Sequence, residues 1–173
     1  TSTNTYPLVI TSPNVTIAAG AKVDALGKGY LGSTTNSTGN RGYTIGNVTG
    51  IGSNYIGGGS HGGYGGSLGG GHEPCNPYGD LYEPVEMGSG SGGNVTYPGS
   101  DGGGAIKLSV SGTLTLNGTI DASGTDGNSA QTYYPGGAGG SVWLDVGTFS
   151  GSGTVSADGG TGRRGPGGGG RIA

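Results

Sequence analysis

Apolar and polar residues alternate in three blocks of the chain, with the period of two that is typical of β-strands. In the second block, for example, Ile106, Leu108 and Val110 alternate with Lys107 and Ser109. Pairs of Gly and Ser residues interrupt this alternation at short intervals, which indicates corners between strands. The pattern therefore predicts three groups of strands and no helix. The three blocks are residues 6–26, 105–124 and 141–159.

The second and third blocks repeat each other. The matching pairs, each 35 positions apart (153 − 118 = 35), are Gly118 and Gly153, Ile120 and Val155, and Ala122 and Ala157. A looser copy in the first block consists of residues 8–10, 15–17, Val23 and Ala25. Short strands that recur at a fixed period are the signature of stacked coils. Such coils build long surfaces and fibres more readily than pockets.

Two architectures are compatible with the strand pattern. Asn117-Gly118 lies between two alternating runs and is a strong hairpin signal, which would make each block an antiparallel meander in a β-sandwich. The repetition of whole blocks instead favours a parallel β-helix, with Ile120 beside Val155 in neighbouring coils. We therefore predict an all-β fold of parallel, solenoid-like coils, with the antiparallel sandwich as the alternative.

A long insertion of residues 27–104 separates the first two blocks and is rich in Gly, Ser, Asn and Tyr. Nearly eighty residues without structure would be unusual within a compact domain. Tyrosines such as Tyr30 and Tyr43 can pack flat on glycine backbone, which carries no obstructing side chain. We expect the insertion to form a loop layer over one side of the coils, or to become ordered only in an assembly.

The whole chain, residues 1–173, is interpreted as one glycine-rich repeat unit. It begins without Met, and residues 171–173 follow a run of glycines as if a further strand were starting. We therefore expect a fragment of a longer chain or polymer. A β-helix with uncapped ends invites association along its axis, so copies of the same chain are the expected partners.

Composition and charge narrow the possible partners. Seven basic and ten acidic residues give a net charge of −3, which is not the basic footprint of a nucleic-acid-binding protein. No apolar run approaches the roughly 20 residues that a membrane-spanning helix needs. We expect neither a nucleic-acid partner nor a membrane span.

Five Asn-x-Ser/Thr tripeptides with a non-proline middle residue occur in the chain, and three of them read Asn-Val-Thr. Such sequons are acceptors for N-linked glycans, which are bulky and hydrated and so require a surface position. The pattern predicts an extracellular or cell-surface glycoprotein. Its glycans would be covalently attached and are also expected as partners, and no cofactor is expected. The predicted glycosylation sites are Asn14, Asn36, Asn47, Asn94 and Asn117.

Candidate chemistry is sparse. His72, Glu73, Cys75 and Asp80 are close in sequence, but no pair of them has the spacing of a zinc site, and a Cys75–His72 nucleophile pair would lack a rigid scaffold. The lone Cys75 cannot form an internal disulfide, and its pairing with another chain or its state as a free thiol stays open. We predict no catalytic, metal or cofactor residues and hence no enzyme, and expect His61 to hydrogen-bond loop carbonyls.

One acidic face is predicted from the strand register. Asp24 and Asp121 hold matching places in their blocks, with Ser156 at that place in the third, and should point outward because their neighbours point inward. Two carboxylates roughly 5 Å apart on adjacent strands could form a weak calcium site. Solvated charges on a polar face are the alternative.

Several glycine-rich stretches are similar to a known class of proteins: residues 61–66 (HGGYGG), 77–80 (PYGD), 87–90 (MGSG), 102–108 (GGGAIKL) and 167–173 (GGGGRIA). From about residue 56 onward the chain resembles the glycine-rich β-helical repeats of large eukaryotic extracellular and cell-surface proteins. That resemblance implies a structural or adhesive role without known catalysis. The expected function is a structural subunit of a filament, fibril or surface coat; the alternative is an adhesin or carbohydrate-binding module whose Tyr-rich loops stack on sugars.

Overall fold

A computed structural model describes residues 7–34, 40–94, 96–131 and 133–173, so the sequon asparagine Asn36 lies outside the described residues. The described residues form eight β-strands and no α-helix. The strands are β1 (Leu8–Ser12), β2 (Val15–Ile17), β3 (Lys22–Asp24), β4 (Ala105–Leu116), β5 (Thr119–Asp121), β6 (Ser141–Ser150), β7 (Thr154–Ser156) and β8 (Arg171–Ile172).

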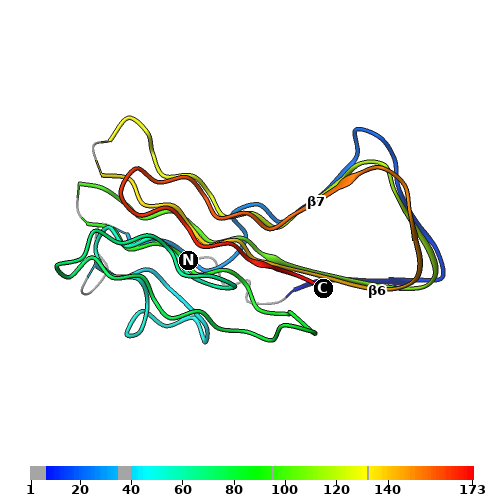
Figure 1. The fold of residues 1–173 in the computed structure, drawn as a ribbon, viewed down its shortest axis with the longest axis horizontal. Coiled ribbons are helices and arrows are strands. Elements are labelled where there is room, and N and C mark those ends of the chain that lie inside the picture. The colour runs from blue at the N-terminus through cyan, green and yellow to red at the C-terminus, as the bar shows by residue number, and fades with distance from the viewer. Residues whose placement is uncertain (1–6, 35–39, 95, 132) are drawn as a thin grey trace.

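The strands form two parallel sheets, as predicted for stacked coils. One sheet has the order β1-β4-β6-β8, with β2 also paired to β4, and the other has the order β3-β5-β7. Each strand block therefore contributes one coil, and the three coils lie in register at one end of the molecule (Figure 1). Because every pairing between these strands is parallel, the all-β solenoid-like fold is confirmed and the antiparallel sandwich is wrong.

The register confirms the repeat and corrects its detail. Ile120 pairs with Val155, 35 positions away as predicted. In the first half of β4 the partner of Ile106 is Val142, at a separation of 36 (142 − 106). An irregularity between Val110 and Thr113 absorbs the extra residue, as in a β-bulge.

A thin apolar core fills the coils. Residues that alternate along β4 and β5 point inward, and Leu108, Leu114 and Ile120 are each 0 % exposed. Side chains at equivalent positions in the coils above and below, such as Val23 and Val155, pack against them. Burying a side chain of this size contributes roughly 1.5–3 kcal/mol, so the middle coil carries most of the core.

The rest of the molecule is a bundle of extended glycine-rich segments beside the coils (Figure 1). We call it the glycine bundle; its segments are residues 29–33, 57–62, 88–93, 99–104, 122–127, 135–140, 157–161 and 165–170. The central segment, 135–140, is hydrogen-bonded through its backbone to six others: 57–62, 88–93, 99–104, 122–127, 157–161 and 165–170. The insertion is thus not a layer over one side of the coils, because it interleaves with the loops that follow the second and third coils.

Backbone hydrogen bonds in this bundle point in several directions instead of lying in one sheet. Ala138, for example, donates its N–H to Ser89 O at 3.0 Å and accepts from Gly103 N at 2.8 Å. The segments lie so close that a Cβ on Gly137 would overlap the backbone oxygen of Asp101. Glycine is required here for close approach of backbones, which lets the segments satisfy their polar groups without a sheet.

Candidate functional site

Three of the predicted glycan acceptors are accessible. Asn14, Asn47 and Asn117 are all exposed. Asn14 Oδ1 accepts from Thr113 N at 2.9 Å and Asn117 Oδ1 from Ser152 N at 3.4 Å, so each caps the neighbouring coil. The Nδ2 atoms of these two asparagines, where an N-glycan attaches, have no hydrogen-bond partner among the described residues. A glycan is therefore compatible with the capping role.

Asn94 is different. It is half-buried, and its Nδ2 donates a 2.9 Å hydrogen bond to Tyr55 Oη. Its Oδ1 accepts from Thr96 N at 2.8 Å and Tyr97 N at 2.7 Å. A glycan would replace one of the two hydrogens of this half-buried Nδ2 beside Tyr55, so this sequon is the least suited of the four that the structure describes.

The last full coil presents an open strand edge. In the described chain, the side of β6 that faces away from β4 pairs with β8 only at Ser141 and Val142. The same side of residues 145–150 and of β7 has no strand partner there. Phe149 is 53 % exposed, whereas its register partner Leu114, which has neighbours on both sides, is 0 % exposed. An open edge with apolar side chains is a template for another strand.

The first coil is open in the same way. The strands β1, β2 and β3 pair on one side only within the described residues. Leu8 is 45 % exposed and its partner in the middle coil, Ile106, is 1 % exposed. Within the described residues, the first and third coils thus present complementary edges of a parallel ladder.

The acidic face predicted on β3 and β5 is present, and a lysine bridges its two carboxylates. Asp24 pairs with Asp121, and Asp121 pairs with Ser156, as the sequence indicated. Lys22 Nζ lies 3.0 Å from Asp121 Oδ2 and 3.4 Å from Asp24 Oδ2. The hydrogen bond to Asp121 raises the pKa of Lys22. The ammonium group of Lys22 thus stands where a calcium ion would have to bind.

The histidine and cysteine near residue 75 serve separate contacts. The His72 ring packs on Tyr55 with ring centroids 4.8 Å apart. Cys75 is a buried free thiol whose Sγ lies 3.1 Å from Ser89 Oγ. Asp80 accepts hydrogen bonds from the backbone of Tyr82, within its own turn. In the described part of the chain, no group of three or more His, Cys, Asp or Glu could hold a metal ion.

His61 belongs to segment 57–62 of the glycine bundle and is buried between Gly139 of the central segment and the ring of Tyr78. It is 0 % exposed, and its Nδ1 lies 3.0 Å from Gly139 O, which confirms the predicted bond to a loop carbonyl. Its Nε2 has no hydrogen-bond partner within the described residues. Burial lowers the pKa of His61 to about 4, so the ring is neutral at pH 7.

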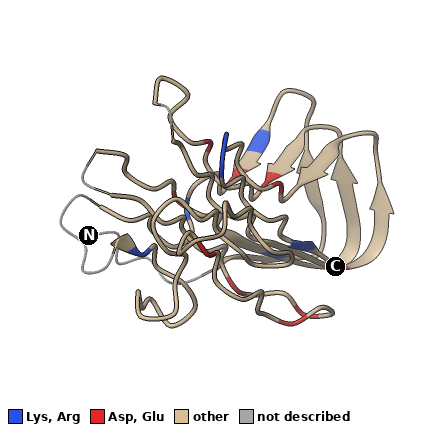
Figure 2. Ribbon diagram, turned by 60° about the vertical axis from the view of Figure 1, so that its left-hand side comes forward, with Lys and Arg blue, Asp and Glu red and all other residues tan. Residues whose placement is uncertain are grey.

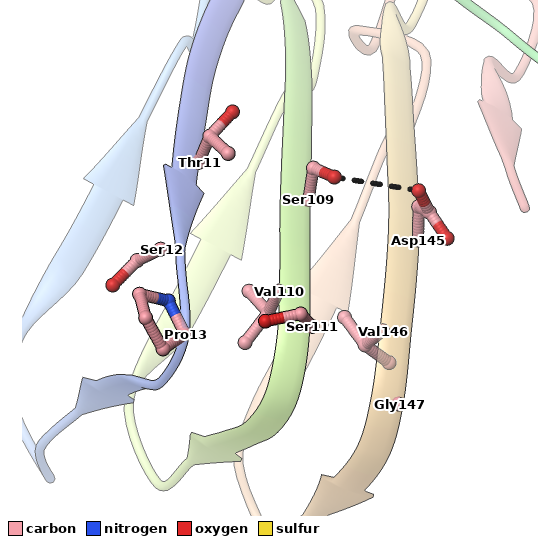
Figure 3. Close-up of a pocket in the computed structure, with 9 residues that line it drawn as sticks. All are labelled: Thr11, Ser12, Pro13, Ser109, Val110, Ser111, Asp145, Val146 and Gly147. Carbon is pink, nitrogen blue, oxygen red and sulfur yellow. Dashed lines mark hydrogen bonds between the residues drawn. The ribbon is translucent and has the colours of Figure 1, made fainter.

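A groove of about 640 Å³ crosses β1, β4 and β6 of the main sheet (Figure 3). Thr11, Ser109 and Asp145 form a row across β1, β4 and β6, because they share one register. Ser109 Oγ donates to Asp145 Oδ2 at 3.3 Å. Asp145 is the one ionisable side chain that lines the groove, so the groove does not offer the paired acid and base of a hydrolytic site.

The structure also has a second hollow, lined by aromatic side chains, that was not predicted from the sequence. It brings Tyr97 and Tyr133 together with Arg164. The residues come from distant loops, so no local motif marks them. The one sequence signal for such a hollow is the clustering of Tyr in otherwise Gly-rich loops.

Charged side chains are few and are scattered over both the coils and the glycine bundle (Figure 2). A search of the described residues found no helix long and apolar enough to cross a membrane. No protein-family model, curated protein or solved structure matches this chain.

Proposed function

We propose that this chain is a structural subunit of an extracellular or cell-surface filament or coat, N-glycosylated and built by stacking its coils end to end. The single observation that carries this proposal is the pair of complementary open edges that the first and third coils present within the described residues. One end offers β1, β2 and β3, and the other offers the distal part of β6 together with β7.

The register within the chain supplies the geometry of the proposed contact. The middle coil receives the first coil on one side and the third on the other with the same side chains facing inward. Continuing that register would place Val15 of a second copy beside Phe149, and Val23 beside Val155. Apolar residues that are partly exposed at both ends would become buried, which favours association.

The strand β8 supports the ability of this edge to accept a further parallel strand. Arg171 and Ile172 pair with Ser141 and Val142, and Leu144 N donates to Ala173 O at 2.8 Å. Because β8 occupies the first part of the edge, a second copy would pair with residues 145–150 and with β7. We therefore expect the contact to use mainly β2 and β3 of that copy.

Head-to-tail contact of this kind joins two different surfaces, so it does not close unless the rotation between copies happens to form a ring. Repeated addition gives a filament. The glycan acceptors Asn14 and Asn117 are exposed at corners between strands, where each side-chain oxygen accepts a hydrogen bond from the next coil. Glycans there would coat the filament without covering its ends.

The test is the assembly state of the protein and of one edge variant. The unmodified chain is expected to form concentration-dependent polymers in sedimentation velocity and filaments in negative-stain electron microscopy. Phe149→Asp places a charge in the proposed contact and should give monomers. Leu81→Asp is the matched control, because Leu81 is 66 % exposed on the insertion and outside the coils, and it should still polymerise.

A folded monomer at all concentrations would overturn the proposal, as would polymers that survive Phe149→Asp unchanged. Circular dichroism of the variants separates loss of assembly from loss of folding. A second candidate function, adhesion to carbohydrate, is favoured by the aromatic hollow and is argued below.

A further inference from the structure

A hollow of about 470 Å³ opens among the loops of the glycine-rich insertion and the two later loops. We call it the aromatic hollow. Its lining residues are Tyr55, Ile56, Leu68, His72, Tyr97, Tyr133 and Arg164. Most of these side chains are aromatic or aliphatic, and ordinary ligand pockets share this combination of apolar walls with a few polar groups.

The aromatic rings form two pairs. Tyr97 and Tyr133 meet edge to face, with centroids 5.7 Å apart and planes at 74°. Tyr55 and His72 are tilted by 40°, with centroids 4.8 Å apart. Edge-to-face and tilted pairs leave part of a ring face uncovered, so the hollow can offer ring faces to a ligand. The apolar C–H face of a pyranose ring is a flat partner of matching size.

Polar groups with unused bonding capacity accompany these rings. Tyr55 Oη accepts the hydrogen bond from Asn94 Nδ2 at 2.9 Å, which leaves its own hydroxyl hydrogen to donate. The hydroxyls of Tyr97 and Tyr133 have no hydrogen-bond partner among the described residues. A ligand rich in hydroxyls would satisfy such groups.

Arg164 gives the hollow its charge. Its guanidinium carbon lies 4.9 Å from the centroid of the Tyr133 ring, a cation–π contact that holds the side chain over the aromatic wall. Within the described residues Arg164 forms no salt bridge, since both ion pairs there involve Lys22. A guanidinium group is a planar fork that matches a carboxylate with two parallel hydrogen bonds. The occupant that complements this site is therefore anionic.

We propose that the aromatic hollow binds a carboxylated sugar residue, with the pyranose ring against Tyr97 and Tyr133 and the carboxylate at Arg164. A neutral sugar would use the aromatic wall but leave the arginine without a counter-charge. A simple carboxylate would pair with the arginine but leave the wall uncovered. An acidic saccharide uses both. This inference does not rest on filament formation, because no residue of the hollow belongs to the open strand edges.

Binding of two matched probes to the full chain tests the inference. Methyl β-D-glucuronide and methyl β-D-glucoside differ at one carbon, which carries a carboxylate in the first and a hydroxymethyl group in the second. Titration followed by NMR should show saturable binding of the glucuronide at least about tenfold tighter than that of the glucoside, as expected for one charge-assisted hydrogen-bonded pair. The Tyr97 and Tyr133 resonances should shift in the titration.

Four variants assign the effect to particular side chains. Arg164→Gln should reduce glucuronide binding to the level of the glucoside, and Tyr133→Ala should weaken both. Arg163→Gln is the matched charge control, and Tyr82→Ala is the aromatic control, because Tyr82 is 83 % exposed and outside the hollow. Both controls should bind like the unmodified chain.

Three results would overturn the inference. The first is that neither probe binds saturably, and the second is that both bind with equal affinity. The third is that Arg163→Gln lowers glucuronide binding as much as Arg164→Gln, since the attraction would then be a general effect of charge. Arg164 is exposed, so its variant should keep the fold even where Tyr133→Ala does not.

Discussion

Ile120 of β5 lies beside Val155 of β7 in parallel register and beside Val23 of β3 on its other side. This row crosses all three coils, and Ile120 is its fully buried middle member. Ile120→Ala should destabilise the protein by about 2–5 kcal/mol, because the cavity would be enclosed by coils on both sides. Val155→Ala, at the half-open end, should cost clearly less. Urea unfolding checks both, and equal costs would contradict the stacked arrangement.

The glycine bundle predicts a sharp contrast between two glycines. A Cβ at Gly137 would overlap the backbone oxygen of Asp101, whereas a Cβ at Gly169 would meet no atom within 4 Å. Gly137→Ala should therefore cost roughly 1–3 kcal/mol or more through overpacking. Gly169→Ala, the control, should be close to neutral. Thermal unfolding of the two variants measures the difference, and similar melting temperatures would argue against the close packing of the segments.

The coils could be predicted from sequence because their side chains repeat. Alternating apolar residues and matched pairs such as Ile120 and Val155 carry the register directly. The glycine bundle could not be predicted, because its contacts are between backbones and leave no pattern of side chains. The separation between partner residues is 36 in the first half of β4 instead of 35, and the sequence did not predict this either. A bulge inserts one polar residue between two runs that otherwise match, so the pattern of apolar residues does not show it.

The candidate sites also differ in how far the sequence predicted them. The adjacency of Asp24 and Asp121 followed from the register, while their bridging by Lys22 depends on the position of one flexible side chain. Lys22 lies two residues before Asp24 and so on the same face of the strand, a signal that was present in the sequence. The contact between Arg164 and Tyr133 joins two loops that have no repeat to align them, so sequence alone did not predict it.

His61 predicts a loss of stability in acid. Its pKa is lowered to about 4 in the folded protein from the ordinary 6.5, because burial disfavours the charged ring. Between these values the unfolded chain binds a proton that the folded chain does not, so stability falls as the pH falls from 6.5 to 4. The full effect is about 3 kcal/mol, at 1.36 kcal/mol for each pKa unit.

The measurement is the free energy of unfolding in urea at several pH values between 7 and 4. His61→Gln lacks the titrating ring, so its stability should change less over this range than that of the unmodified chain. Parallel pH profiles for the two proteins would show that His61 is not the group responsible.

The sequons predict unequal glycan occupancy. Asn14, Asn47 and Asn117 are exposed, whereas Asn94 Nδ2 is engaged by Tyr55. In protein secreted from a glycosylating host, peptide mass spectrometry should find glycans at the exposed sites and less at Asn94. Where Asn94 does carry a glycan, the protein should unfold more easily, because the half-buried side chain must move to fit a glycan beside Tyr55. Full occupancy at Asn94 with unchanged stability would contradict this expectation.

The proposed head-to-tail contact makes a prediction about mixtures of two blocked variants. Phe149→Asp blocks the β6 edge and leaves the β1 end intact, whereas Val15→Asp blocks the β1 end and leaves the β6 edge intact. Each variant alone should be monomeric, since every contact needs one end of each kind. A mixture retains one compatible pair of ends and should form dimers that grow no further.

Sedimentation velocity distinguishes this outcome from other forms of assembly. A symmetric contact, in which the same end meets itself, would let each variant dimerise alone through its intact end and would gain nothing on mixing. Circular dichroism first establishes that both variants fold, since Val15 also packs against the core of the coils. Dimers confined to the mixture follow only when two different surfaces meet, which is the condition for an open filament.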